Sequence, residues 1–199
     1  VDLATDDLLN FGGALGQVTT FDVPFRATPY FHSGKHTLKV VGVATTFADA
    51  TELVGWALND LLRAPDGHCY VGAVDFNLFA DPSKIGQPSP LVHVTPDGRA
   101  TVATREIVFP NGMTILRSGE LLVADSLTGE LLAFTRQADG TLIDRRVWAA
   151  LPGEMPDGIS LDAEGAVWIA SHQRVLRVRE GGEISDVVDM ASTRATACM

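Results

Sequence analysis

Three stretches of the chain begin with a side chain that carries oxygen and then run into a short apolar segment. The three side chains are Asn59, Asn111 and Asp157, and each stands eight residues before a glycine. Carboxylate and amide oxygens are the ligands that hard divalent cations take, and a carboxylate can also accept a proton. Asp and Asn equally dominate turns, and from the residues alone a turn at the start of a strand is the favoured interpretation of Asp157.

The three stretches are copies of one unit. They read LNDLLRAPDGHCYVGA, PNGMTILRSGELLVAD and PDGISLDAEGAVWIAS, and the aligned Asn or Asp residues lie 52 and 46 residues apart. Each copy is followed by two extended runs around a turn that holds Asp97-Gly98, Asp139-Gly140 or Gly181-Gly182, dipeptides that favour hairpins. The spacing therefore predicts four antiparallel strands in roughly 45–50 residues, the size of a β-propeller blade.

The repeat predicts an all-β chain with about four blades' worth of sequence, in a single propeller domain over residues 1–199. The repeat units are residues 46–105, 106–150 and 151–199, and residues 1–45 form an atypical or partial blade. Within that last segment VTTFDVPF and TLKVVGVATTF are predicted strands. A propeller with so few blades has open edge strands, so we expect either a second copy of the chain or a longer native polypeptide to cover them.

Composition and charge exclude several classes of partner. The formal charge is −10 and no Lys or Arg cluster occurs, which argues against nucleic acid and acidic membranes as partners. No apolar run approaches the roughly 20 residues that a bilayer-spanning helix needs. No signal peptide is visible, and Cys69 and Cys198 lack the spacing of a metal site. A cytoplasmic protein with reduced thiols is the expectation.

Residues 56–199 carry blocks that resemble a known family. Asn59-Asp60, Pro110-Asn111-Gly112 and Pro156-Asp157-Gly158 follow one another in the order found in the gluconolactonase / senescence-marker-protein (regucalcin-like) family of six-bladed propellers. Further resembling blocks are FPNGMTI, VADSLTGELLAF, GTLIDRRVW, MPDGISLDAEGAVWIAS and the closing ACM. The resemblance implies a β-propeller of the six-bladed gluconolactonase type.

The resemblance also implies a divalent metal and a reaction. The metal, calcium first, with zinc, magnesium or manganese as alternatives, would be held by Asn111 and Asp157. Asp157 would serve as general base, Asn59 would contact the substrate or a metal-bound water, and Asp60 would support Asn59. Such proteins hydrolyse sugar lactones or related cyclic esters, so a small lactone is the expected partner. For Asp125 a place at the cavity mouth and a structural hydrogen-bonding role are equally open.

One departure from the family keeps a second function open. The family's first blade begins with a Glu-Gly-Pro block that carries a metal-binding Glu, and the sequence contains no such block. Trp56-Ala57-Leu58 also stands before Asn59-Asp60, where family members often have an Arg. The alternative is a non-catalytic or degenerate propeller, either a binding module or a fragment.

Overall fold

A computed structural model describes residues 18–25, 36–43, 47–77 and 82–198, the first two ranges by their backbone alone. The chain divides into two units, Val1–Phe47 and Ala48–Met199. In the first unit β1 (Val18–Phe25) pairs antiparallel with β2 (His36–Val43). The strand predictions for VTTFDVPF and for residues 37–43 of TLKVVGVATTF are therefore confirmed, while residues 1–17, 26–35 and 44–45 of the predicted segment 1–45 lie outside the described residues.

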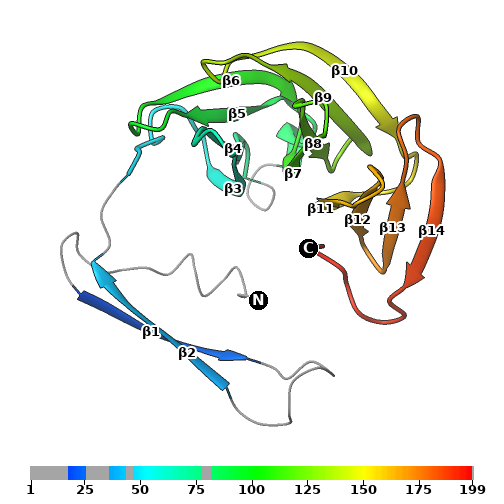
Figure 1. Ribbon diagram of the computed structural model, residues 1–199, viewed down its shortest axis with the longest axis horizontal. Coiled ribbons are helices and arrows are strands. Elements are labelled where there is room, and N and C mark those ends of the chain that lie inside the picture. Colours follow the sequence, from blue (N-terminus) through cyan, green and yellow to red (C-terminus); the bar gives the residue numbers. More distant parts are fainter. Residues whose placement is uncertain (1–17, 26–35, 44–46, 78–81, 199) are drawn as a thin grey trace. The chain divides into compact units, whose positions relative to one another are not determined.

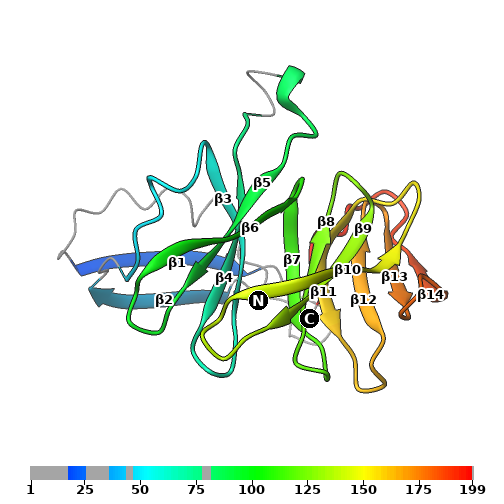
Figure 2. The same ribbon diagram turned by 90° about the horizontal axis from the view of Figure 1, so that it is seen from above.

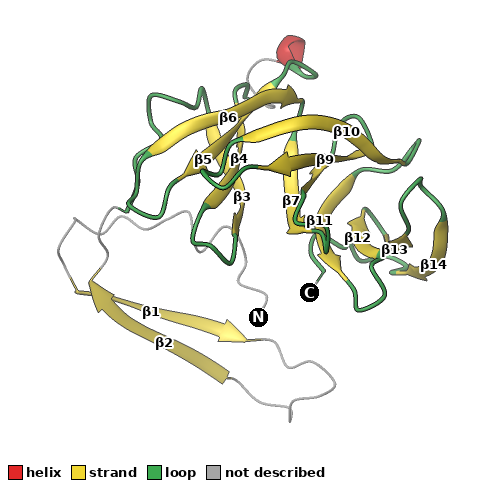
Figure 3. Ribbon diagram, turned by 45° about the horizontal axis from the view of Figure 1, so that its top comes forward, coloured by secondary structure: helices red, strands yellow, loops and turns green. Residues whose placement is uncertain are grey.

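The second unit consists of three four-stranded antiparallel sheets (Figure 1). The first sheet contains β3 (Ala57–Arg63), β4 (Cys69–Val74), β5 (Ser89–Val94) and β6 (Ala100–Ile107). The second contains β7 (Pro110–Ile115), β8 (Leu121–Asp125), β9 (Glu130–Arg136) and β10 (Leu142–Ala150). The third contains β11 (Pro156–Leu161), β12 (Val167–Ser171), β13 (Arg174–Val178) and β14 (Ile184–Asp189). One 3-10 turn, η1 (Pro82–Lys84), is the helix drawn in Figure 3.

Each sheet is a meander in which consecutive strands are neighbours. The four strands per repeat that the spacing predicts are thus confirmed in all three units. The first strands of the sheets, β3, β7 and β11, are called the inner strands below; β7 is in contact with both of the others (Figures 1 and 2). The extent of a single propeller domain over residues 1–199 stays a prediction.

The core lies between neighbouring sheets, and the middle sheet is buried on both faces. Leu121 and Val123 of β8 pack in a cluster with side chains of the first sheet, whereas Leu122 and Ala124 pack with the third. Successive side chains of a strand point to opposite faces, so both faces of β8 need apolar residues. This explains why LLVAD reads as a continuous apolar run rather than an alternating one.

A polar cluster joins the first sheet to the turn between β9 and β10. His68 Nδ1 lies 2.8 Å from His93 Nε2, and the two rings are stacked. The Tyr70 hydroxyl donates to the Gly140 carbonyl (2.7 Å) and accepts from Arg136 Nε (3.2 Å). His93 is only 4% exposed, so its ring has little access to water.

We expect the His93→Gln substitution to reduce the loss of stability on acidification. Burial, together with the positive charge of His68, Arg136 and Arg99, lowers the pKa of His93, although Asp139 opposes this. The unfolded chain therefore binds a proton at His93 more readily than the folded chain does. The resulting penalty is absent at neutral pH and grows as the pH falls below about 6.5.

Urea unfolding of the wild type and His93→Gln between pH 7 and pH 5 measures this effect. The free-energy difference between the two proteins should shift in favour of the variant as the pH falls. His172→Gln is the matched control, because His172 is exposed. A difference that does not change with pH for His93→Gln would contradict the expectation.

Candidate functional site

The predicted site residues sit at a bulge that recurs in all three inner strands. The pairing register shifts between Leu58 and Leu61 in β3 and between Pro110 and Met113 in β7. The same shift occurs between Pro156 and Ile159 in β11. A bulge bends its strand and re-aims the side chains within it, and bulges are frequent beside functional sites. The residues inside the three bulges are Asn59-Asp60, Asn111-Gly112 and Asp157-Gly158.

Two glycines allow close backbone approach at these bulges, Gly112 between β7 and β11 and Gly158 between β11 and the C-terminal segment. A Cβ on Gly112 would lie 2.5 Å from the Asp157 carbonyl oxygen and 2.6 Å from the Ile159 nitrogen. A Cβ on Gly158 would lie 2.7 Å from the Cα of Ala197. These positions admit no side chain, which is the physical reason for the glycine in the PNG and PDG triplets. The close approach brings Asn111 and Asp157 together.

A buried serine holds the Asn111 side chain in place. Its amide Nδ2 donates to Ser126 Oγ (3.1 Å), and Asn111 is 7% exposed. The Asn111 side chain also interacts with the Asp157 carboxylate and opposes the rise in the pKa of Asp157. An amide nitrogen carries two hydrogens, so Nδ2 can serve both partners while Oδ1 remains an acceptor.

Asp157 is the carboxyl group with the most unusual environment at the inner strands. Burial, and then the negative charge of Asp60, raises the pKa of Asp157 to about 6, against an opposing effect of the Asn111 hydrogen bond and the Arg194 charge. A carboxyl group with this pKa exchanges its proton near neutral pH, as a general base must. Acid–base sites commonly contain such perturbed groups.

Asn59 and Asp60 are adjacent in the sequence but have different interactions in the structure. Burial of its carboxyl raises the pKa of Asp60, although the residue retains solvent contact, and its charge acts on Asp157. The amide of Asn59 instead donates to the Pro110 carbonyl oxygen (3.1 Å) on the neighbouring inner strand. Asp60 is therefore electrostatically coupled to Asp157, and Asn59 links β3 to β7.

Asp125 has the structural role that the sequence left open. Its carboxylate accepts the backbone N–H groups of Val108 (2.8 Å) and Phe109 (3.0 Å), and the residue is 2% exposed. These bonds fix the chain immediately before β7 and so position the strand that carries Asn111.

Three residues near Asp157 were not found by sequence reasoning. Ser126 contacts Asn111, the charge of Arg194 acts on Asp157, and Asp157 and burial together raise the pKa of the Cys198 thiol. Gly158 N–H donates to the Thr196 carbonyl (2.9 Å), which lays the C-terminal segment along β11. Cys198 lies in the ACM block that resembles the family, but no spacing pattern in the sequence linked Cys198 to Asp157.

The donor chemistry of this site fits a hard divalent cation in part. Asp157 supplies a carboxylate and Asn111 an amide oxygen, the donors that calcium prefers, and Asp60 adds negative charge nearby. Within the part of the chain that the structure describes, no group of three or more His, Cys, Asp or Glu side chains is arranged to hold a metal ion. Asn111 and Asp157 are therefore a partial ligand set.

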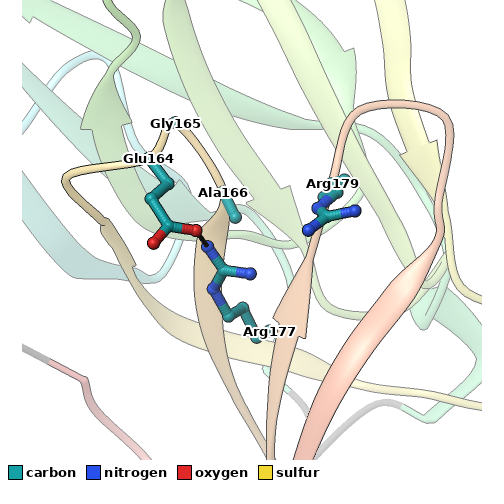
Figure 4. A pocket seen from close by; sticks show the side chains of 5 residues that line it. All are labelled: Glu164, Gly165, Ala166, Arg177 and Arg179. Carbon is teal, nitrogen blue, oxygen red and sulfur yellow. Dashed lines mark hydrogen bonds and ion pairs between the residues drawn. The ribbon is translucent and has the colours of Figure 1, made fainter.

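A surface cavity of about 370 Å³ on the third sheet is separate from these residues. It is lined by Glu164, Gly165, Ala166, Arg177 and Arg179 (Figure 4). The Arg177 guanidinium donates to Asp162 (2.7 Å), Glu164 (2.7 Å) and Ser185 Oγ (3.1 Å). All three guanidinium nitrogens of Arg177 are bonded within the protein, and two of their partners, Asp162 and Glu164, are carboxylates that balance its charge.

The fold and the site together define a section of a β-propeller whose polar residues gather at the bulged inner strands. Residues 31–199 match the family described as the SMP-30/gluconolactonase/LRE-like region. The chain belongs to that family, as the ordered motifs of the inner strands predict. No curated protein matches the chain at a significant level.

Solved structures give the same fold. A gluconolactonase from Xanthomonas campestris is 25% identical, with a TM-score of 0.62, and the match covers 80% of this chain and 55% of that one. The calcium-binding protein regucalcin from Agrobacterium tumefaciens is 20% identical, with a TM-score of 0.63 and coverage of 79% and 53%. A luciferin-regenerating enzyme is 19% identical, with a TM-score of 0.64 and coverage of 94% and 62%.

These matches confirm the prediction of a gluconolactonase-type propeller. The chain spans between 53% and 62% of the length of the three structures. Among the described residues, no helix has the length and apolar character needed to cross a bilayer.

Proposed function

We propose that the chain contributes to a metal-dependent hydrolase that opens a sugar lactone or a related cyclic ester. The observation that carries this proposal is the pair Asn111 and Asp157, which lie in the bulges of two neighbouring inner strands and interact through their side chains. Membership of the family supports it, and so does the Xanthomonas campestris relative, which is named a gluconolactonase.

Asn111 and Asp157 would hold the divalent cation, with calcium the first choice because one relative is named a calcium-binding protein. When bound, the cation polarises the lactone carbonyl and lowers the pKa of water. Asp157 accepts the proton of the attacking water as the general base. Asn59 and Asp60 orient the substrate at the neighbouring inner strand.

The test is a lactone-opening assay that follows acid release from gluconolactone, with calcium added or chelated. We expect turnover above the uncatalysed rate with calcium, and loss of that turnover on chelation. Magnesium, manganese and zinc, added in turn to the chelated protein, identify the working ion. Turnover that is unchanged by chelation would contradict the metal-dependent mechanism.

A second function, a non-catalytic or degenerate propeller, is favoured by one observation. The described residues contain no group of three or more metal-binding side chains, and a partial ligand set binds a cation weakly. Calorimetry with calcium separates the two functions. Submicromolar binding supports the hydrolase, whereas weak binding without lactone turnover supports the second function.

Location and assembly complete the proposal. Cys69 and Cys198 are both free, in keeping with a cytoplasmic protein whose thiols stay reduced. We also propose that a second copy covers open edges, because apolar side chains such as Leu58, Leu61 and Val187 are more than half exposed on the terminal sheets. Sedimentation of the purified protein tests this, and a monomer at high concentration would contradict it.

A further inference from the structure

Two equivalent asparagines of the repeat make different hydrogen bonds. Asn59 and Asn111 occupy the same position in the bulges of β3 and β7. The amide of Asn59 donates to the carbonyl of Pro110, the first residue of the next inner strand. The amide of Asn111 donates to Ser126 instead of to the corresponding carbonyl, that of Pro156, and its side chain also interacts with Asp157.

Ser126 accounts for this difference. Its hydroxyl donates to the Pro156 carbonyl oxygen (2.6 Å), so that acceptor is already bonded by another group. The same hydroxyl oxygen accepts from Asn111 Nδ2 (3.1 Å), which turns the amide toward the serine. Ser126 is 5% exposed, and its backbone N–H donates to the Phe109 carbonyl (3.1 Å), so the hydroxyl is held in a fixed place.

The repeat itself shows that the sheet does not need a hydroxyl at this position. Asp125 pairs with Pro110 as Ala73 pairs with Leu58 and Ser171 pairs with Pro156. The residues that follow are Ser126, Val74 and His172, so the first and third sheets form without a serine there. The hydroxyl therefore has a role specific to the second sheet.

We infer that Ser126 is a positioning residue that diverts the Asn111 amide from the inter-strand carbonyl and directs it toward Asp157. This inference rests on the proposed function for its consequence, the binding of a cation by Asn111 and Asp157. It adds to that function a residue, Ser126, that fixes the ligand Asn111 relative to the ligand Asp157. Partners that orient a metal ligand commonly affect metal affinity about 10–100-fold.

The Ser126→Ala variant tests the inference through two readouts. Crystal structures of metal-free wild type and variant near 1.2 Å resolution resolve the orientation of the Asn111 amide. We expect the amide in Ser126→Ala to bond the Pro156 carbonyl, as Asn59 bonds Pro110, and to leave Asp157. We also expect calcium affinity, measured by calorimetry, to fall about 10–100-fold.

Two further variants control for a general loss of structure. Ser126→Thr keeps the hydroxyl and should restore both the amide orientation and the calcium affinity. Thr128→Ala removes a hydroxyl from the same turn, whose one hydrogen bond within the described part of the chain is to the Asp125 carbonyl (3.5 Å), and should change neither. If Ser126→Ala loses calcium affinity and Ser126→Thr loses it equally, the role of Ser126 is structural and the inference fails.

The two claims can fail separately. If the wild type binds no calcium and opens no lactone, the proposed function fails, while the two crystal structures still decide whether Ser126 directs Asn111. If Asn111 keeps its contact with Asp157 in Ser126→Ala, the inference is overturned whatever the calcium affinity of the wild type.

Discussion

Gly112→Ala is expected to lower the free energy of unfolding by about 3 kcal/mol or more, because the added methyl group meets backbone rather than a movable side chain. Its Cβ would lie 2.5 Å from the Asp157 carbonyl oxygen, 2.6 Å from the Ile159 nitrogen and 2.7 Å from the Gly158 Cα. Relief of these contacts requires β7 and β11 to separate. One of these atoms belongs to Asp157 and the others to the residues that follow it, so calcium affinity should fall together with stability.

Urea or thermal unfolding measures this loss, and Gly119→Ala is its control. Gly119 has a positive φ of 89° and open space around its Cβ position, so that substitution tests conformational strain without a clash. Strain of that kind costs about 1–2 kcal/mol. If Gly112→Ala were no more destabilising than Gly119→Ala, the inner strands would not be in the tight contact described above.

Asp157→Asn is expected to change function and stability in opposite directions. The amide removes the general base and weakens a cation ligand, so lactone turnover should fall by about 10²–10⁴-fold and calcium affinity should fall with it. Measured without calcium, the variant should be more stable than the wild type at neutral pH, because it removes a desolvated charge that Asp60 repels.

The sign of the stability change follows from proton binding. The pKa of Asp157 is raised to about 6 in the folded chain from its ordinary value of 3.8, so the folded chain binds this proton more tightly. The ionised group therefore destabilises the fold, with no penalty below pH 3.8 and a penalty that grows as the pH rises toward 6. The advantage of Asp157→Asn should grow over the same range.

Asp125→Asn is the matched control for this measurement. The Asp125 carboxylate accepts two backbone N–H groups, and an amide can replace only one of its two oxygens as an acceptor. This substitution should destabilise the fold at neutral pH. A loss of stability for Asp157→Asn similar to that for Asp125→Asn would show that Asp157 is a structural residue rather than a functional one.

The fold could be predicted from sequence because its signals are local and repeated. Each glycine eight residues after Asn59, Asn111 or Asp157 has a positive φ of 89–92°, so the hairpin turn at that point requires the residue that the sequence shows. The register of the three copies also agrees with the strand pairing, in which Ala73, Asp125 and Ser171 take equivalent places.

The contacts of the site were less accessible to sequence reasoning, because they cross between sheets. The repeat predicts equivalent contacts for Asn59 and Asn111, yet their amides have different hydrogen-bond partners. That difference depends on Ser126, which lies 15 residues after Asn111 on the far end of a hairpin. The influence of Asp60 on Asp157 likewise joins residues almost a hundred positions apart, which no spacing pattern records.

The burial of the middle sheet on both faces has a consequence for local opening of the unit. Stacked repeats behave as a nearly one-dimensional array, in which an interior member is held by two interfaces and a terminal member by one. Amide hydrogen exchange should therefore be slow in β8 and β9. Asn111 lies on the strand beside β8, and Asp157 lies on the next sheet. Local opening between the second and third sheets would separate the two residues, so partial unfolding alone would disassemble the site.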